Sequence, residues 1–163
     1  MSNLVLARPL LCISLCSIML ATSGTADAKP VVLKGHAEAV DGDTLMLNGK
    51  RIRLFGVDAF EWDQTCGRFA CGAQADRALN LLIASQSITC ERQDIDPYGR
   101  TVAICKTSAG LDIGGEMVRR GLAVAYRTFS MKYLPDEAYA RAHRAGAWAY
   151  GFQSPLDYRR SQH

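Results

Sequence analysis

The fold is decided by residues 41–61, which read Asp-Gly-Asp-Thr-Leu-Met-Leu-Asn-Gly-Lys-Arg-Ile-Arg-Leu-Phe-Gly-Val-Asp-Ala-Phe-Glu. Two short apolar-rich runs, residues 44–47 and 51–55, are joined through Asn48-Gly49. An Asn-Gly pair between two such runs is the strongest short-range signal for a tight β-hairpin. The stretch therefore predicts two antiparallel strands with a turn at Asn48.

Closing this hairpin would bring Asp43 near Asp58 and Glu61, which follow the second strand. Three carboxylates in one place repel one another and raise one another's pKa values unless positive charge lies among them. Hard cations such as calcium bind oxygen ligands of this kind. Arg53 would then lie beside a metal ion, an arrangement that suits the binding of a phosphate. The stretch predicts a site for phosphate chemistry.

A second cation follows in residues 96–100, Asp-Pro-Tyr-Gly-Arg, whose composition is typical of a turn. Strand-like runs, residues 88–92 and 101–105, lie on either side of it. A hairpin over residues 88–106 would place Tyr98 and Arg100 at its end, where both could point into a common cleft.

These three motifs, in this order and spacing, resemble the thermonuclease family, the calcium-dependent staphylococcal nuclease-like enzymes. The family signature is Asp-Gly-Asp-Thr, then Arg-x4-Asp-x-x-Glu, then Asp-x-Tyr-Gly-Arg, matched here by residues 41–44, 53–61 and 96–100. The resemblance extends over residues 35–152. The pattern of elements alone predicts an α+β fold. The resemblance implies an OB-fold, a five-stranded β-barrel, here with three helices.

The resemblance also implies the ligands of a calcium ion. Asp43, Asp58 and the main-chain oxygen of Ala59 would hold the ion, and Glu61 would reach it through a water molecule. A metal ion in this position would serve as a Lewis acid and as a template for the phosphoryl oxygens.

The catalytic residues implied by the resemblance are Arg53, Glu61 and Arg100. Glu61 would orient or deprotonate the attacking water, a role that needs a carboxylate within hydrogen-bond reach. The two arginines would grip the phosphate oxygens, because a guanidinium donates two parallel bonds and stays protonated. Tyr98 and Tyr126 are the expected substrate neighbours, since aromatic rings stack on bases. Packing alone is the alternative for Tyr126.

The sequence departs from the family pattern at three places. Ala59-Phe60 stands where the family often has a proline, so a rigid turn before Glu61 is lost. Pro97 stands where a basic residue is common. Thr128-Phe129 replaces a second substrate-side aromatic residue of the family or shifts it by one position.

Composition permits this function without indicating it. The chain has 163 residues, enough for one compact domain, with 48% hydrophobic and 21% charged residues. A formal charge of +3 is mild for a nucleic-acid-binding protein. The prediction therefore depends on the motifs.

Residues 1–28 are expected to be a signal peptide. Arg8 precedes an apolar run, residues 10–21, and Ala26-Asp27-Ala28 has the small-x-small pattern of a cleavage site. The run is short for a membrane span, and a retained anchor is the alternative. We expect an exported monomer, periplasmic or secreted, with no stable membrane association after cleavage.

Four of the six cysteines lie beyond this segment: Cys66, Cys71, Cys90 and Cys105. An even number in an exported chain indicates disulfides, and three pairings are formally possible. Cys90 and Cys105 are equally far from the centre of the second hairpin, so a two-residue turn would place them opposite each other. We favour this bridge together with Cys66–Cys71.

Outside the hairpins, alternation predicts a strand over residues 31–40, and helical spacing predicts a helix over residues 73–84. Asp112 is a good N-cap for a short helix that stops at Gly121. A last helix is expected to begin around residues 135–137, where proline and acidic residues suit the first turn, and to end near Gly146 to Gly151. Four residues form the apolar face of the first helix: Ala75, Leu79, Leu82 and Ile83.

Residues 29–152 would form the nuclease domain, and residues 153–163 a loosely held C-terminal tail in which Pro155 and Tyr158 could pack back. We interpret Trp62, Trp148 and Phe152 as packing residues.

Three functions compete at this stage. The first is a calcium-dependent endo- or exonuclease that hydrolyses phosphodiester bonds of DNA and RNA with little sequence preference and leaves 3'-phosphate ends. The second is a non-catalytic OB-fold module that binds nucleic acid. The third is an exported domain that binds protein or another anionic polymer. The presence of Glu61 and both arginines favours the nuclease.

Overall fold

The computed structural model describes residues 30–162. The predicted signal peptide lies outside the described residues. Within residues 30–162, no helix is both long enough and apolar enough to cross a membrane.

The first hairpin forms as predicted, from β3 (Thr44–Leu47) and β4 (Lys50–Leu54). Its turn residues Asn48 and Gly49 have φ angles of 51° and 73°. Positive φ at both central positions is the backbone that an Asn-Gly pair supplies at low cost, and its twist matches that of the flanking strands. The register pairs Thr44 with Arg53, so the site-bearing ends of both strands lie side by side.

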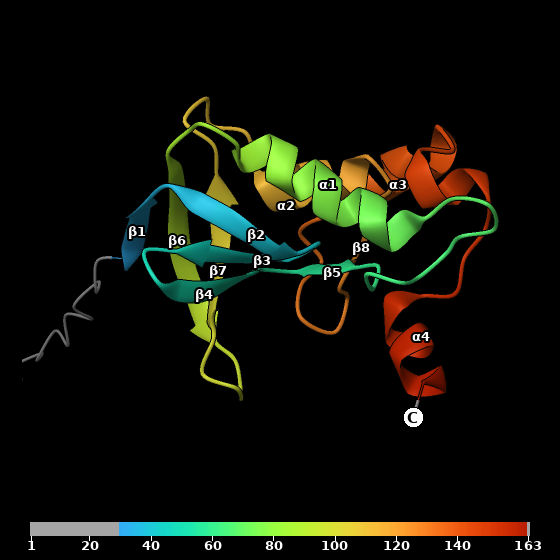
Figure 1. Ribbon diagram of the computed structural model, residues 1–163, viewed down its shortest axis with the longest axis horizontal. Coiled ribbons are helices and arrows are strands. Elements are labelled where there is room, and N and C mark those ends of the chain that lie inside the picture. The colour runs from blue at the N-terminus through green and yellow to red at the C-terminus, as the bar shows by residue number, and fades with distance from the viewer. Residues whose placement is uncertain (1–29, 163) are drawn as a thin grey trace, which may run out of the picture.

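The predicted strand over residues 31–40 is divided at His36 into β1 (Val32–Gly35) and β2 (Ala37–Asp41). The six-stranded sheet has the order β1-β6-β7-β4-β3-β2. Its two edge strands therefore belong to one nearly continuous segment, which pairs with β6 on one side and β3 on the other. The sheet curls back on itself, and the predicted five-segment, OB-like barrel is confirmed (Figure 1).

The second hairpin consists of β6 (Ile88–Ile95) and β7 (Thr101–Lys106), and β7 also pairs in parallel with β4. Cys90 lies opposite Cys105 in the register, and the predicted disulfide joins them. The predicted two-residue turn is wrong. Residues 96–100 form a longer loop, and an irregularity between Arg92 and Asp94 in β6 restores the pairing at the disulfide.

A small second sheet was not predicted. β5 (Val57–Ala59) pairs antiparallel with β8 (Ala123–Ala125), and both strands are short. Three-residue strands carry too few residues for an alternating pattern to be visible in the sequence. This sheet holds Asp58 beside the barrel.

Helix α1 (Cys71–Ile83) buries the apolar face that periodicity predicted. It packs on β2, as Figure 1 shows. The short helix α2 (Ile113–Arg119) begins at the predicted cap, where the Asp112 side chain accepts a hydrogen bond from Gly115 N at 3.2 Å.

The third helix is shorter than predicted. α3 (Leu134–Ala142) ends before Arg144, whose φ of 51° breaks the helical path. A separate 3-10 turn, η1 (Gly146–Ala149), follows it.

The expectation of a loosely held tail is wrong. Residues 155–161 form a fourth helix, α4 (Pro155–Ser161), capped by Ser154, whose Oγ accepts a bond from Asp157 N at 3.2 Å. Pro155 is buried and suits the first helical turn. Figure 1 shows α4 apart from the other three helices, and it contacts β5. The C-terminal residues therefore reach the part of the fold that holds Asp58.

Candidate nuclease site

The end of the barrel places three carboxylates around the guanidinium groups of Arg53 and Arg159. Asp43 directly precedes β3, Asp58 is the middle residue of β5, and Glu61 follows two residues after that strand. Gly56, with a φ of 67°, allows the sharp turn from β4 into β5 that a side chain would disfavour. The main chain of Ala59 donates to Asp43 Oδ2 at 3.2 Å and ties β5 to the start of β3.

Arg53 bridges two of these carboxylates. Its Nη1 lies 2.8 Å from Asp43 Oδ1, and its Nη2 lies 3.4 Å from Asp58 Oδ1. The same Nη2 donates to the main-chain oxygen of Val57 at 3.2 Å. Only 18% of the Arg53 side chain is exposed, so this pairing is largely shielded from water.

Burial makes the two aspartates depend on nearby cations. Asp43 is 6% exposed and Asp58 is 1% exposed. Burial raises the pKa of Asp43 to about 6, against the lowering effect of Arg53. Burial also raises the pKa of Asp58, while Arg159 and then Arg53 oppose that rise. Ionised carboxylates in this position need positive charge beside them.

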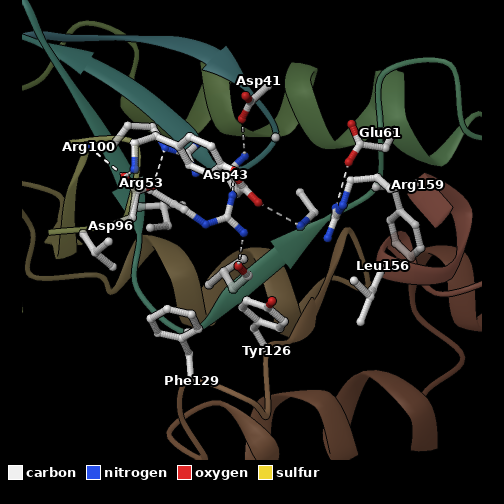
Figure 2. Close-up of a pocket in the computed structure, with 18 of the residues that line it drawn as sticks. Asp41, Asp43, Arg53, Glu61, Asp96, Arg100, Tyr126, Phe129, Leu156 and Arg159 are labelled. Carbon is white, nitrogen blue, oxygen red and sulfur yellow. Dashed lines mark hydrogen bonds and ion pairs between the residues drawn. The ribbon is translucent and has the colours of Figure 1, made fainter. Parts of the chain in front are cut away.

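Arg159, from α4, is a site residue that the sequence did not reveal. Its Nη1 lies 2.8 Å from Glu61 Oε1, and its Nη2 lies 3.0 Å and 3.1 Å from the two oxygens of Asp58. Figure 2 shows Arg159 and Glu61 on one side of Asp43, with Arg53 and Arg100 on the other. Arg159 belongs to none of the sequence motifs. It lies about a hundred residues from both partners in the chain, so no local pattern indicates the contact.

Arg100 lines the same cleft without joining the carboxylate cluster. Its Nε lies 2.6 Å from Asp96 Oδ2, within the loop that connects β6 and β7. Asp96 also accepts from the main-chain nitrogens of Tyr98 and Arg100, which fixes the loop. The guanidinium lies over the ring of Tyr98, which is 86% exposed.

The cleft has a volume of about 500 Å³ and is bordered by exposed aromatic rings. Trp62 is 68% exposed, so its interpretation as a packing residue is wrong. Phe129 is 48% exposed and stacks on the half-buried Tyr126, with ring centroids 5.4 Å apart. Phe129, and not Thr128, lines the cleft, which favours a one-position shift of the second aromatic. Leu156 of α4 completes one wall.

Packing replaces the missing proline before Glu61. Phe60 is buried and meets the ring of Phe152 edge to face, with centroids 5.0 Å apart. The predicted Cys66–Cys71 disulfide is confirmed and belongs to the same small apolar cluster. Trp148 and Phe152 pack against each other, as expected. The backbone at Phe60 is therefore anchored by its side chain.

Gln64 holds the loop on the other side of Glu61. Its side chain is 1% exposed, accepts from Glu61 N at 3.2 Å and donates to the main-chain oxygen of Gln153 at 2.8 Å. The main-chain nitrogen of Gly72, in α1, donates to Gln64 O at 3.1 Å. Glu61 is thus tied to α1 and to the C-terminal segment.

The donor set fits a hard divalent cation chemically, since Asp43, Asp58 and Glu61 offer only carboxylate oxygens and two of them are buried. Over residues 30–162, however, no three acidic, histidine or cysteine side chains converge as metal ligands. The guanidinium groups of Arg53 and Arg159 stand between the carboxylates instead.

Comparison with known proteins supports the interpretation of the motifs. A family model described as staphylococcal nuclease homologue matches residues 51–150. The chain is 33% identical over 137 residues to the succinoglycan biosynthesis protein ExoI of Rhizobium meliloti strain 1021, covering 80% of this chain and 71% of that protein. It is 30% identical over 139 residues to a micrococcal nuclease of Shigella flexneri, covering 75% and 77%. An uncharacterized endonuclease of Haemophilus influenzae is 33% identical over 116 residues, covering 67% and 62%.

Proposed function

Because the chain belongs to the staphylococcal nuclease homologue family, we propose that it is an exported, calcium-dependent nuclease that hydrolyses phosphodiester bonds of DNA and RNA. The observation that carries the proposal is the cleft itself, which is lined by Asp43, Glu61, Arg53 and Arg100, with Asp58 buried beside Arg53. The two disulfides support export, because such bridges persist in oxidising compartments.

Calcium, when bound, would supply Lewis acidity and charge to the phosphoryl oxygens. Asp43, Asp58 and the main-chain oxygen of Ala59 would hold it, with Glu61 reaching it through water. The backbone of both aspartates is held by strands, Asp43 directly before β3 and Asp58 within β5, whereas their side chains would have to exchange arginine partners for a cation.

The chain's own residues would perform the remaining steps. Glu61 is 40% exposed at the cleft, where it can orient a water and accept its proton. Arg100, on the exposed loop, can donate two parallel bonds to the phosphate as negative charge develops. Arg53 is already shared between Asp43 and Asp58 and presents its remaining donor capacity to the same cleft.

A non-catalytic nucleic-acid-binding module is the second candidate. One observation favours it: Arg53 and Arg159 already balance the charge of the carboxylates where a metal would be needed. Cleavage assays distinguish the two candidates directly.

The test is digestion of end-labelled single-stranded DNA and RNA by the purified protein, with calcium and then with excess chelator. We expect cleavage that chelation abolishes and calcium restores. The new 5' ends should accept phosphate from polynucleotide kinase without prior phosphatase treatment, as 3'-phosphate products require. Binding without cleavage by folded, calcium-supplied protein would reject the nuclease and favour the binding module.

The exposed indole of Trp62 is expected to stack on a base of the substrate. Trp62→Ala should weaken binding of a non-cleavable single-stranded oligonucleotide about tenfold, because base stacking on an aromatic ring contributes roughly 1–3 kcal/mol. Fluorescence anisotropy measures the Kd. Trp62→Phe retains a ring and should lose much less. Equal Kd values for Trp62→Ala and the wild type would remove Trp62 from the binding surface.

A further inference from the structure

The guanidinium of Arg159 occupies the oxygens that a cation at this site would need. Its fork spans Glu61 Oε1 at 2.8 Å and both Asp58 oxygens at 3.0 Å and 3.1 Å. Asp58 is 1% exposed and makes a further contact with Arg53 Nη2 at 3.4 Å. An ion that binds Asp58, and whose water bonds to Glu61, must therefore compete with Arg159 for these oxygens.

The charges of the cluster also indicate that Arg159 opposes the binding of a divalent ion. Asp43, Asp58 and Glu61 carry three negative charges when ionised, and Arg53 and Arg159 return two positive ones. A positive charge beside a carboxylate weakens the binding of any further cation to that carboxylate, whether the cation is a proton, calcium or a guanidinium. Arg159 thus lowers the attraction of the cluster for a divalent ion while it keeps the buried carboxylates balanced.

The position of α4 leaves Arg159 able to withdraw. The helix is anchored by Pro155, which is buried, and by its contact with β5. The Arg159 side chain is 36% exposed and extends to the carboxylates from the cleft side. Rotation of this long side chain toward solvent would free Asp58 and Glu61 without undocking the helix.

We propose that Arg159 is a positioning residue that competes with the divalent cation for Asp58 and Glu61. In the metal-free protein it holds both carboxylates in place, and calcium binding displaces it. This inference rests on the proposed calcium dependence and predicts the direction of one effect: removal of Arg159 strengthens calcium binding. A purely structural role in docking α4 predicts the opposite, since loss of packing would loosen the ligands.

The experiment is an isothermal titration of calcium into purified wild type, Arg159→Gln, Arg159→Lys and Arg160→Gln. Arg160 is the matched control, because it lies next in the same helix, its side chain is 71% exposed, and it contacts Asp157 at 3.8 Å, outside the site. We expect the calcium Kd to fall at least about tenfold in Arg159→Gln, the scale on which one neighbouring charge shifts cation binding to a carboxylate. Arg160→Gln should match the wild type.

Arg159→Lys keeps the charge but loses the fork that holds two carboxylates at once. Its Kd should fall between those of the wild type and Arg159→Gln, and it decides the question if Arg159→Gln does not fold by circular dichroism. An unchanged or higher Kd in the folded Arg159 variants overturns the inference alone. Absence of calcium binding in every protein overturns both the inference and the proposed calcium dependence.

Discussion

Replacing Arg100 by alanine is expected to lower kcat at least about 100-fold while the fold persists. Arg100 lies over Tyr98 and pairs with Asp96, whose side chain is 6% exposed. Asp96 keeps its bonds from the main-chain nitrogens of Tyr98 and Arg100 in the variant, so the loop persists while the proposed donor to the phosphate is lost. Deleting one preorganised donor to a developing negative charge costs about 10²–10³ in rate. The measurement is the steady-state rate on single-stranded DNA with saturating calcium.

Two variants make this result specific. Arg92→Ala removes an exposed arginine from the same hairpin, outside the cleft, and should leave kcat unchanged. Arg100→Lys restores charge without the planar fork and should recover only part of the rate. Glu61→Ala, measured alongside, should also lose most turnover, because the attacking water loses its orienting carboxylate. Normal rates from folded Arg100→Ala and Glu61→Ala would contradict the assignment of this cleft.

Gly72→Ala should both destabilise the protein and slow cleavage. A Cβ on Gly72 would lie 1.6 Å from the main-chain oxygen of Glu61 and 2.8 Å from that of Trp62. Backbone cannot yield to such a contact as a flexible side chain would, so α1 or the loop that carries Glu61 must move. We expect a loss of about 3 kcal/mol in the free energy of unfolding. A shift of Glu61 by about 1 Å would cost roughly 100-fold in rate.

The direction of the change in the free energy of unfolding distinguishes this contact from an ordinary helix substitution. Alanine in a helix is ordinarily more stable than glycine by roughly 0.5–1 kcal/mol. Gly115→Ala in α2 is the control, because there the nearest atom is a Tyr133 ring carbon at 3.3 Å, a longer contact with a side chain instead of with backbone. Urea denaturation measures both variants. A stabilised Gly72→Ala protein would show that α1 does not press on the Glu61 backbone.

Local signals predicted several elements well. Asn48-Gly49 determined the first hairpin because its positive φ angles are intrinsic to those residue types. Asp112 began α2 because its side chain caps a nearby main-chain nitrogen. The face of α1 was visible because burial repeats with the helical period. In each case the cause and its effect lie within a few residues of each other.

Other predictions failed where the local structure depends on contacts with distant parts of the chain. The disulfide Cys90–Cys105 was predicted correctly, but from a two-residue turn that the structure replaces with a longer loop and a bulge. The tail was expected to be loosely held, and seven residues have little helical stability of their own. Capping by Ser154 and burial of Pro155 support the helix instead.

The sequence by itself determined the order of the motifs, and through their resemblance to a family it predicted the barrel. It also indicated that Asp43, Asp58, Glu61 and Arg53 would lie together, since they flank one hairpin and its continuation. Only the tertiary structure decided that Arg159 would hold Asp58 and Glu61 and that Trp62 would remain exposed at the cleft. Local propensity acts over a few residues, whereas an ion pair between residues about a hundred positions apart forms only when the folded chain brings them together.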